Sequence, residues 1–433
     1  MIGNSSDGKK MYKWAQDLFP INRSITGAGV RETLNYLKGL NPAMTVSAVP
    51  SGTPAFDWIV PEEWQIRGGW IEDPSGERIV DFKNDNLHVV GYSVPTDQYL
   101  SLEDLQLHLH SLKDQPTAIP YVTSYYNRNW GFCLTETQRQ NLEPGVYRAV
   151  IDSDLTSGYL NYGELLLKGK SEKEVFISTY VCHPSMANNE ISGPVVASAI
   201  AQWLSSIGET RYSYRFVFIP ETIGSIVYLS LNLPDLKDNV IAGFNVTCVG
   251  DERCFSFLPS RKGDTLSDRA ASHALRHIDK NYKKYSWLDR GSDERQYCSP
   301  GIDLPIASIM RSKFGEYPEY HTSLDDLDFV TSVGLEGSLN AFKAAILAIE
   351  NNCRPVSKTL GEPQLGKRGL FPNLSKKGST DHMRIMLHLL SYADGEKDLI
   401  EIADIIDVSI TELSPLCCLL QEAGLLDLNY KLF

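Results

Sequence analysis

The feature that most constrains this chain is an apolar run that leads into a histidine-bearing loop and then into a helix of small residues. Residues 175–180 are typical of a buried strand, and residues 194–204 are typical of a helix that packs closely on a sheet. His183 lies between them, where open α/β sheets place their ligands. Taken alone, the stretch is better interpreted as a plain strand–loop–helix connection with a hydrogen-bonded histidine. A function for His183 therefore depends on what the rest of the chain brings to it.

The composition excludes several classes of protein. The chain has 433 residues, enough for two or three domains, and its hydrophobic fraction of 42% is that of an ordinary globular protein. No apolar run is long enough to cross a bilayer, and the first residues lack the apolar core of a signal peptide. The eight cysteines are scattered without a Cys-x-x-Cys pair, which is typical of reduced thiols. We expect a cytoplasmic protein with no membrane partner.

The rhythm of the predicted elements indicates an α/β domain. Two helices are predicted near the start of the chain, and from residue 174 to about residue 348 strands alternate with helices. Such apolar strands fit a mixed, mostly parallel sheet that is covered by helices. The strands are predicted at residues 175–180, 215–220, 240–249 and 306–310. We expect this domain to be built from residues 1–46 and 164–354.

Residues 47–163 have a different texture and predict an inserted β-rich domain. Short alternating runs are broken by turn signals, and strands are predicted at 86–92, 105–109 and 145–151. The run 123–132 is both aromatic and polar. The lining of a pocket is one interpretation of it, and a core strand flanked by a turn is the interpretation that we favour.

The end of the chain predicts a winged helix-turn-helix domain at residues 370–433, after a linker rich in proline and glycine at 355–373. Its helices are predicted at 380–393, 399–406 and 409–422. Residues 399–424 contain no Lys or Arg and five acidic side chains, and the whole chain carries a formal charge of −13. Because phosphate contacts need positive charge, we expect no nucleic-acid partner, but a protein partner or a homo-oligomer through this domain.

Four separated side chains are predicted to converge at one edge of the sheet. His183, Glu221 and Asp251 each follow a predicted strand, and His321 lies in a loop after another. The carboxyl ends of parallel strands share an edge, so these side chains can meet in one crevice. Two histidines and a carboxylate are a normal ligand set for catalytic zinc, and a further carboxylate can take the proton of a water molecule. Together they favour a metal site.

These motifs resemble those of known zinc enzymes. The segments 183–193, 221–224 and 321–325 resemble zinc aminopeptidases of the bacterial leucyl aminopeptidase and glutaminyl cyclase kind. The whole chain more closely resembles an uncharacterised bacterial family that joins an aminopeptidase-like domain to an inserted small domain and a C-terminal winged helix. Residues 18–27 and 291–297 also fit that family.

The resemblance implies a role for each matched residue. Glu221 corresponds to the general base, and His183, His321 and Asp251 are the candidate zinc ligands. The candidates for a supporting or substrate-binding role are Ser192, Asp293, Arg295, Tyr297 and Asp325.

Departures from the aminopeptidase pattern limit the expected metal content. Asn189 replaces the metal-bridging aspartate and is a poor zinc ligand, while Thr222 and Thr247 replace two further carboxylate ligands. Ser185 replaces the acid that orients the first histidine. Since two zinc ions need several carboxylates to offset their charge, we expect one zinc ion at most.

Two hypotheses about function follow. The first is a zinc-dependent hydrolase of an amide bond, acting on a peptide or on an aminoacyl or N-acyl small molecule. The resembling family is sometimes linked to surface polysaccharide biosynthesis, which adds an amino-sugar amide as a candidate substrate. The second is a degenerate binding protein that retains the pocket without the chemistry. A third, a transcription regulator, is opposed by the acidic tail.

Overall fold

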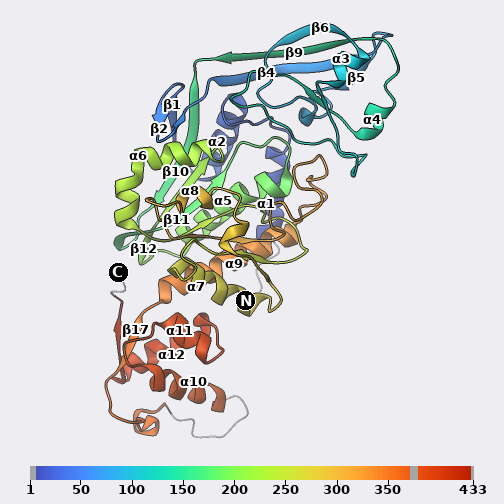
Figure 1. Ribbon diagram of the computed structural model, residues 1–433. Coiled ribbons are helices and arrows are strands. Elements are labelled where there is room, and N and C mark those ends of the chain that lie inside the picture. Colours follow the sequence, from blue (N-terminus) through green and yellow to red (C-terminus); the bar gives the residue numbers. More distant parts are fainter. Residues whose placement is uncertain (1–5, 371–378, 431–433) are drawn as a thin grey trace.

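The computed structural model describes residues 6–370 and 379–430 and divides into three parts (Figure 1). The central part is an eight-stranded sheet in the order β1-β10-β12-β11-β13-β16-β14-β15. These strands are β1 (Thr45–Pro50), β10 (Tyr159–Leu167), β11 (Ser171–Tyr180), β12 (Tyr212–Ile219), β13 (Val240–Asn245), β14 (Ser256–Leu258), β15 (Lys283–Lys284) and β16 (Ile306–Met310). The middle strands β12, β11, β13 and β16 run parallel, and β1 and β10 extend the sheet antiparallel. The predicted fold class is confirmed.

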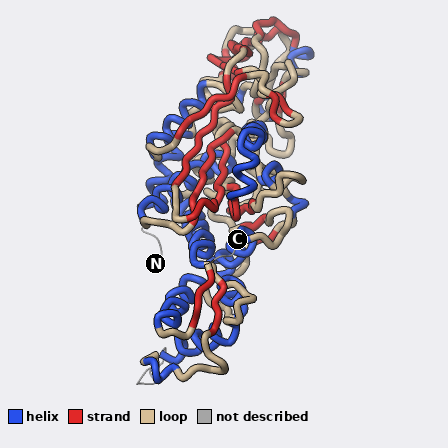
Figure 2. The backbone as a smooth tube through the Cα atoms, turned by 90° about the vertical axis from the view of Figure 1, so that its left-hand side faces the viewer, coloured by secondary structure: helices blue, strands red, loops and turns tan. Residues whose placement is uncertain are grey.

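Helices cover both faces of this sheet because its central strands are apolar on both sides (Figure 2). Alternate residues of β11 face different cores: Val175 and Ile177 pack in one, and Phe176 packs in the other. The first core also contains α1 (Ser6–Leu18), α2 (Ala28–Leu40), α5 (Ser192–Ser206), α7 (Leu266–Ile278) and α9 (Ser332–Asn351). The second core contains α6 (Ile223–Asn239) and α8 (Glu294–Tyr297).

The inserted domain contains a four-stranded antiparallel sheet in the order β5-β4-β9-β6. Its strands are β4 (Glu63–Glu72), β5 (Arg78–Asp81), β6 (Thr96–Ser101) and β9 (Val146–Thr156). Its shorter elements are β2 (Pro54–Ala55), β3 (Trp58–Ile59), β7 (Leu109–His110), β8 (Phe132–Cys133), α3 (Leu102–Gln106) and α4 (Glu136–Gln140). The expected boundaries at 46/47 and 163/164 fall inside β1 and β10, which belong to the large sheet.

Two strands predicted in the insertion begin instead as helical turns, and in both cases a side-chain cap explains the difference. Only their later residues, Val89, Gly91 and Leu109, pair as predicted. Ser101 accepts a hydrogen bond from the backbone N–H of Asp104, so the chain turns into α3 where a strand was predicted at 105–109. Asp85 likewise accepts from the N–H of Leu87 and begins the 3₁₀ turn Asn86–His88. Local capping outweighs the apolar pattern at both positions.

The C-terminal domain begins earlier than the sequence predicts. β17 (Arg354–Ser357) pairs with β18 (Leu426–Asn429) as a two-stranded sheet, although its residues read as the start of a linker. The helices are α10 (Ser379–Tyr392), α11 (Leu399–Ile405) and α12 (Ile410–Glu422). The rest of the expected linker includes residues 371–378, which lie outside the described part of the chain.

This domain is docked on the α/β domain by a histidine of α7. His273 is buried, its Nδ1 lies 2.7 Å from a carboxylate oxygen of Asp404, and its Nε2 accepts a hydrogen bond of 2.9 Å from the N–H of Ile410. Ile410 is the first residue of α12, so this contact fixes the start of that helix. Arg269 adds an ion pair with Asp398.

Among the described helices, none combines the length and the apolar character that a membrane span requires.

Helix α5 approaches the sheet so closely that only glycine fits at its second position. A Cβ on Gly193 would lie 2.3 Å from the Oγ1 atom of Thr179 and 2.4 Å from the carbonyl oxygen of Val246. The carbonyl belongs to the backbone and cannot rotate away. The first turn of α5 therefore rests directly on the strands that precede the site.

We predict that Gly193→Ala lowers the free energy of unfolding by about 1–3 kcal/mol, because the added methyl group overpacks this contact. The control is Gly39→Ala in α2, where no heavy atom lies within 4 Å of the added Cβ. That substitution should be neutral or stabilise by about 0.5–1 kcal/mol. Urea denaturation measures both, and equal stabilities of the two variants would contradict the packing argument.

Candidate active site

The candidate site lies at the carboxyl ends of the parallel strands β11, β12 and β13. Tyr180 at the end of β11 is in register with Ile219 at the end of β12. His183 follows the first strand by three residues and Glu221 follows the second by two. The chain leaves the sheet here, so its side chains converge on one edge.

His183 is held in one orientation by two carboxylates. It is 3% exposed, its Nδ1 lies 2.7 Å from an oxygen of Glu190, and its Nε2 lies 3.6 Å from an oxygen of Glu221. The strong contact with Glu190 assigns the ring proton to Nδ1 and leaves the lone pair of Nε2 facing Glu221. Burial by itself lowers the pKa of His183, but the hydrogen bond and the charge of Glu190 outweigh it, so the pKa is raised.

Glu190 was not among the predicted site residues. On an extended segment its side chain would start on the face opposite Asn189, but residues Ala187–Ile191 form a single π-helical turn. This turn brings the buried Glu190 carboxylate back to His183. Glu190 thus occupies the orienting role that the aminopeptidase pattern gives to an acid at the position of Ser185. Such turns within helices are frequent at functional sites.

Asp325 fixes the geometry of this turn. Its carboxylate accepts hydrogen bonds from the backbone N–H groups of Asn188 at 2.6 Å and Asn189 at 3.0 Å, and from the hydroxyl of Tyr317 at 3.0 Å. Its carbonyl oxygen accepts from the N–H of Ala187 at 2.8 Å. Asp325 is therefore a fully buried residue that holds the turn in place, and its side chain is not exposed in the open part of the site.

His321 faces His183 from the neighbouring loop. The two ring centroids lie 5.3 Å apart, and His321 adopts a left-handed backbone with φ of 57°. A non-glycine residue in this region is strained, which is common in functional loops. Burial lowers the pKa of His321 to about 3, with a smaller contribution from His183, so its imidazole is neutral. No described residue forms a hydrogen bond with its ring nitrogens.

Two positions that carry metal-binding carboxylates in the aminopeptidase pattern are neutral and bonded to each other. The amide nitrogen of Asn189 donates to the hydroxyl of Tyr180 at 2.9 Å, and the hydroxyl of Thr247 donates to the carbonyl oxygen of Asn189 at 2.9 Å. Tyr180 and Thr247 are joined by a further bond of 2.5 Å. The side-chain oxygen of Asn189 is buried and has no partner among the described residues.

Asp251 does not join the histidines. Its carboxylate accepts four hydrogen bonds, from the N–H and hydroxyl of Ser312, the amide of Asn188 and the N–H of Arg253. A ligand role would require some of these bonds to break. The one group of His, Cys, Asp and Glu ligand atoms that lie within 4.8 Å of one another among residues 6–370 and 379–430 is formed by Cys182, His183 and Glu190.

Two other predicted residues support the site from the core. The hydroxyl of Ser192 donates to the carbonyl of Asn188 and accepts from the N–H of Val249, so it joins the turn at residues 187–191 to the segment after β13. Tyr297 is fully buried, and its hydroxyl lies 2.7 Å from that of Ser178 in the middle of β11. Neither side chain reaches the open part of the site.

Glu221 lies at the mouth of the site, with 21% of its side chain exposed. Burial raises its pKa, against the opposing charges of His183 and Arg295. The next residue, Thr222, has a left-handed backbone with φ of 63°, and its hydroxyl accepts a hydrogen bond of 2.7 Å from Arg295. Its N–H donates to the buried Asp293 at 2.7 Å. Arg295 and Asp293 thus hold the loop that presents Glu221.

The inserted domain covers the site with two tyrosines, of which Tyr125 belongs to the aromatic run 123–132 and Tyr121 was not singled out from the sequence. Tyr121 packs against both histidine rings, with centroids 5.1 Å from His183 and 5.2 Å from His321, and its N–H donates to the carbonyl of His321. Its hydroxyl lies 3.0 Å from that of Tyr125. The aromatic run 123–132 read as a core strand, because the sequence does not show which tyrosines face another domain.

A buried arginine links the N-terminal motif to the site. The Nε of Arg23 donates to the carbonyl of His183 at 3.0 Å, and its Nη1 donates to the carbonyl of Leu18 at 2.7 Å. Arg23 is only 1% exposed. This contact places the motif at residues 18–27 beside the histidine.

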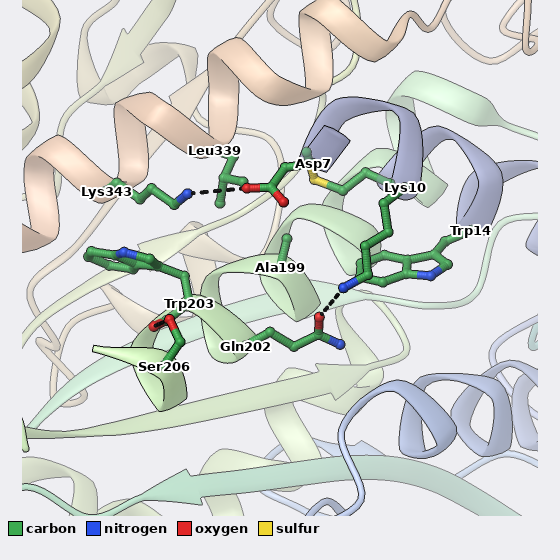
Figure 3. Close-up of a pocket in the computed structure, with 10 residues that line it drawn as sticks. Asp7, Lys10, Trp14, Ala199, Gln202, Trp203, Ser206, Leu339 and Lys343 are labelled. Carbon is green, nitrogen blue, oxygen red and sulfur yellow. Dashed lines mark hydrogen bonds and ion pairs between the residues drawn. The ribbon is translucent and has the colours of Figure 1, made fainter. Parts of the chain in front are cut away.

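A separate pocket of about 270 Å³ lies between α1, α5 and α9 and contains none of these residues (Figure 3). Its polar side chains bond one another, Lys343 with Asp7 at 3.6 Å and Lys10 with Gln202 at 2.8 Å. Its charged groups are therefore already paired, and we do not count it as a candidate active site.

The fold, with a histidine and a glutamate beyond adjacent parallel strands, defines a protein of the aminopeptidase-like class. Solved structures with this fold include BSAP, a zinc aminopeptidase from Bacillus subtilis, at 12% identity and a TM-score of 0.60 over 80% of this chain and 95% of that chain. Another is a peptidase M28 precursor from Shewanella amazonensis, at 12% identity and a TM-score of 0.55 over 79% and 95%. At this identity the likeness shows the fold alone.

The particular family is shown by closer matches. Residues 12–352 match the family described as a domain of unknown function (DUF4910), and residues 353–428 match a winged helix-turn-helix family. The Clostridium acetobutylicum protein named "Putative polysaccharide biosynthesis protein with aminopeptidase-like domain" is 42% identical, over 93% of this chain and 92% of that protein. A crystal structure of a "putative peptidase" from that organism is 40% identical, with a TM-score of 0.92 over 98% and 97%. The chain belongs to this family, and the predicted resemblance is confirmed.

Asp293 generates a prediction about pH. Burial, with a contribution from Glu221, raises the pKa of Asp293 to about 8, well above the ordinary value for aspartate. The folded protein therefore holds a proton that the unfolded chain releases near pH 4. The stabilisation is complete at acid pH and is lost as the pH rises through about 8.

We predict that Asp293→Asn, which cannot lose a proton, becomes progressively more stable than the natural protein as the pH rises from 5 to 9. The slope is at most about 1.4 kcal/mol per pH unit, the value for one proton. Chemical denaturation across this range measures it. The control is Asp328→Asn, an exposed position whose side chain makes no hydrogen bond within the described residues. Parallel profiles for Asp293→Asn and the natural protein would show that Asp293 is already ionised at neutral pH.

Proposed function

We propose that this protein is a metal-dependent hydrolase of amide bonds with Glu221 as the general base. The observation that carries the proposal is the position of the Glu221 carboxylate, 3.6 Å from the Nε2 atom of His183 and partly open to solvent. A base must reach both the attacking water and the group that holds the substrate carbonyl. Its raised pKa brings proton exchange closer to neutral pH.

Three groups of the site offer unpaired donor atoms to a single zinc ion: two imidazoles, which zinc prefers, and one amide oxygen, a weaker ligand. His183 presents the lone pair of Nε2, His321 is neutral with no ring hydrogen bond among the described residues, and the side-chain oxygen of Asn189 is buried without a partner. We propose these three groups as ligands, in place of a set that includes Asp251, because the oxygens of Asp251 are already bonded. When bound, zinc supplies Lewis-acid polarisation of an amide carbonyl.

The chain's own residues would carry the proton transfers. Glu221 removes a proton from the attacking water and returns it to the leaving amine nitrogen, which it can do because its carboxyl group exchanges one proton in each direction. Glu190 keeps the proton of His183 on Nδ1, so that Nε2 remains a lone-pair donor. Tyr121 and Tyr125 cover the site and exclude bulk water, which strengthens the interactions inside it.

The substrate we propose is an amide of a small molecule, either an aminoacyl or an N-acyl compound, or a short peptide. Tyr121 and Tyr125 cover the site, and this cover favours small substrates over long chains. The name of the Clostridium relative assigns that protein to polysaccharide biosynthesis, which favours an amino-sugar amide here.

A binding protein without catalysis is the second candidate. The bonds among Asn189, Thr247 and Tyr180 favour it, because neutral groups that bond one another stand where the aminopeptidase pattern has carboxylates, and only the side-chain oxygen of Asn189 is left without a partner. The retained Glu221 and the two histidines favour the hydrolase.

For the winged helix we propose a structural role rather than DNA binding. The start of α12 is occupied by His273, and helices α11 and α12 contain no Lys or Arg. Helix α12 begins against His273 and carries Glu412 in its first turn, so its N-terminal end is poorly suited to contact phosphates. Contacts with a protein partner, or with a second copy of the chain, remain our expectation for its exposed face.

We predict that Glu221→Gln lowers amide hydrolysis by about 10²–10⁴-fold, because the base is lost while the shape of the side chain is retained. Zinc content and the unfolding midpoint should not change. The assay uses aminoacyl p-nitroanilides and N-acyl amino sugars with the natural protein as reference. The control is Glu77→Gln, an exposed glutamate of the inserted domain. Turnover by Glu221→Gln at the natural rate would exclude Glu221 as the base.

We predict at most one zinc ion per chain. Two zinc ions lie about 3.5–4 Å apart in paired sites and need a bridging carboxylate, whereas the amide of Asn189 has no charge. Asn189→Asp should tighten zinc binding, measured by competition with a chelator, and His321→Ala should weaken it. Elemental analysis of protein purified without a chelator gives the number of ions. Two equivalents in the natural protein would refute the argument from charge.

A further inference from the structure

A cleft of about 510 Å³ lies where the inserted domain meets the α/β domain. Four separate segments contribute to its lining: the loop after α1 at Phe19 and Asn22, the segment 82–87 of the inserted domain, and the two site loops at Ser185 and Ser323. Each of these serines lies two residues after a site histidine. The volume is within the range of small-molecule sites.

Three of the polar side chains that line this cleft are amides without a partner among the described residues. Asn22, Asn84 and Asn86 line it, and none of their side chains forms a hydrogen bond with a described residue. The side-chain oxygen of Asn86 is buried and unpaired. Because an unpaired buried acceptor is costly, this oxygen calls for a donor from a ligand. An amide group offers both donors and an acceptor, which matches neighbouring hydroxyl groups.

The cleft has no surplus of positive charge. Arg67 is paired with Asp152 and Asp154. The carboxylates of Asp85 and Asp326 also line the cleft and accept hydrogen bonds from backbone N–H groups. Lys83 is the one cation of this cleft without an ion pair in the described part of the chain. A phosphate or nucleotide ligand would require several free cations or a helix N-terminus, so this balance favours an uncharged polar ligand.

Two aromatic rings complete the lining. Phe19 and Phe82 are half-buried and line the cleft from the α/β domain and the inserted domain respectively. Unpaired amides beside apolar ring surface suit a ligand that has hydroxyl groups on its rim and C–H groups on its faces. A peptide would instead favour a free strand edge, and the segment 82–87 is a turn followed by a 3₁₀ helix.

We propose that this cleft is a saccharide-binding site that takes one or two sugar rings, with Asn84 and Asn86 bonding to their hydroxyl or acetamido groups. The site goes beyond the proposed hydrolysis, because binding requires neither Glu221 nor a metal. A bound saccharide would contact both loops that carry the site histidines, through Ser185 and Ser323.

The test is direct binding to the full chain carrying Glu221→Gln, so that hydrolysis plays no part. The probes are glucose, galactose, mannose, rhamnose, glucuronic acid, N-acetylglucosamine, N-acetylgalactosamine, cellobiose and N,N′-diacetylchitobiose. Saturation-transfer difference NMR identifies binders, and titration gives their affinity. We expect at least one probe to bind with a dissociation constant of about 1 mM or lower.

Two substitutions locate the binding. Asn86→Ala and the exposed Asn84→Ala should each weaken binding by at least about fivefold, the effect of losing one or two hydrogen bonds. Asn281→Ala, an exposed asparagine between α7 and β15, is the matched control and should leave the affinity unchanged. Asn84→Ala keeps the test valid if Asn86→Ala lowers the melting temperature. Absence of binding by every probe, or binding that survives both substitutions, would overturn the proposal.

Discussion

The site depends on the carboxylate of Asp325, which holds two successive backbone N–H groups of the turn at residues 187–191. Without these bonds the turn would lose acceptors for its buried donors, and such donors are costly to leave unpaired. The turn also brings the carboxylate of Glu190 to the ring of His183 and the side chain of Asn189 to the hydroxyl of Tyr180. Asp325 also lies four residues after His321, so one buried carboxylate couples the two histidine-bearing loops.

Charge is distributed unevenly around the two histidines. Carboxylate oxygens of Glu190 and Glu221 lie 2.7 Å and 3.6 Å from the ring nitrogens of His183, and Asp293 bonds to the loop that follows Glu221. Asn189 and Thr247 are neutral and bonded to each other. Since no carboxylate of a described residue forms an ion pair with His321, the negative charge of the site gathers around His183.

Only one of the two additional domains contributes to the site. The inserted domain packs Tyr121 against both histidine rings and, through Asn84 and Asn86, forms one wall of the neighbouring cleft. The C-terminal domain instead docks on α7, where the start of α12 is bonded to His273. The insertion therefore contributes side chains to the site, whereas the C-terminal domain contacts α7 outside the site.

The sequence by itself indicated the four parallel strands of the sheet, because short apolar runs such as 175–180 and 306–310 are typical of buried strands, and it placed His183 and Glu221 at the ends of two of them. The tertiary structure decided which polar side chains face each other. Asp251 was predicted directly after a strand at 240–249, but β13 ends at Asn245, and Ser312 and Asn188 bond to the Asp251 carboxylate. Glu190 and Tyr121 reach His183 through a tight turn and through a domain inserted far away in the chain. Periodicity reports which residues are buried, but the partner of a buried polar group is set by turn geometry and long-range packing, and these depend on the whole fold.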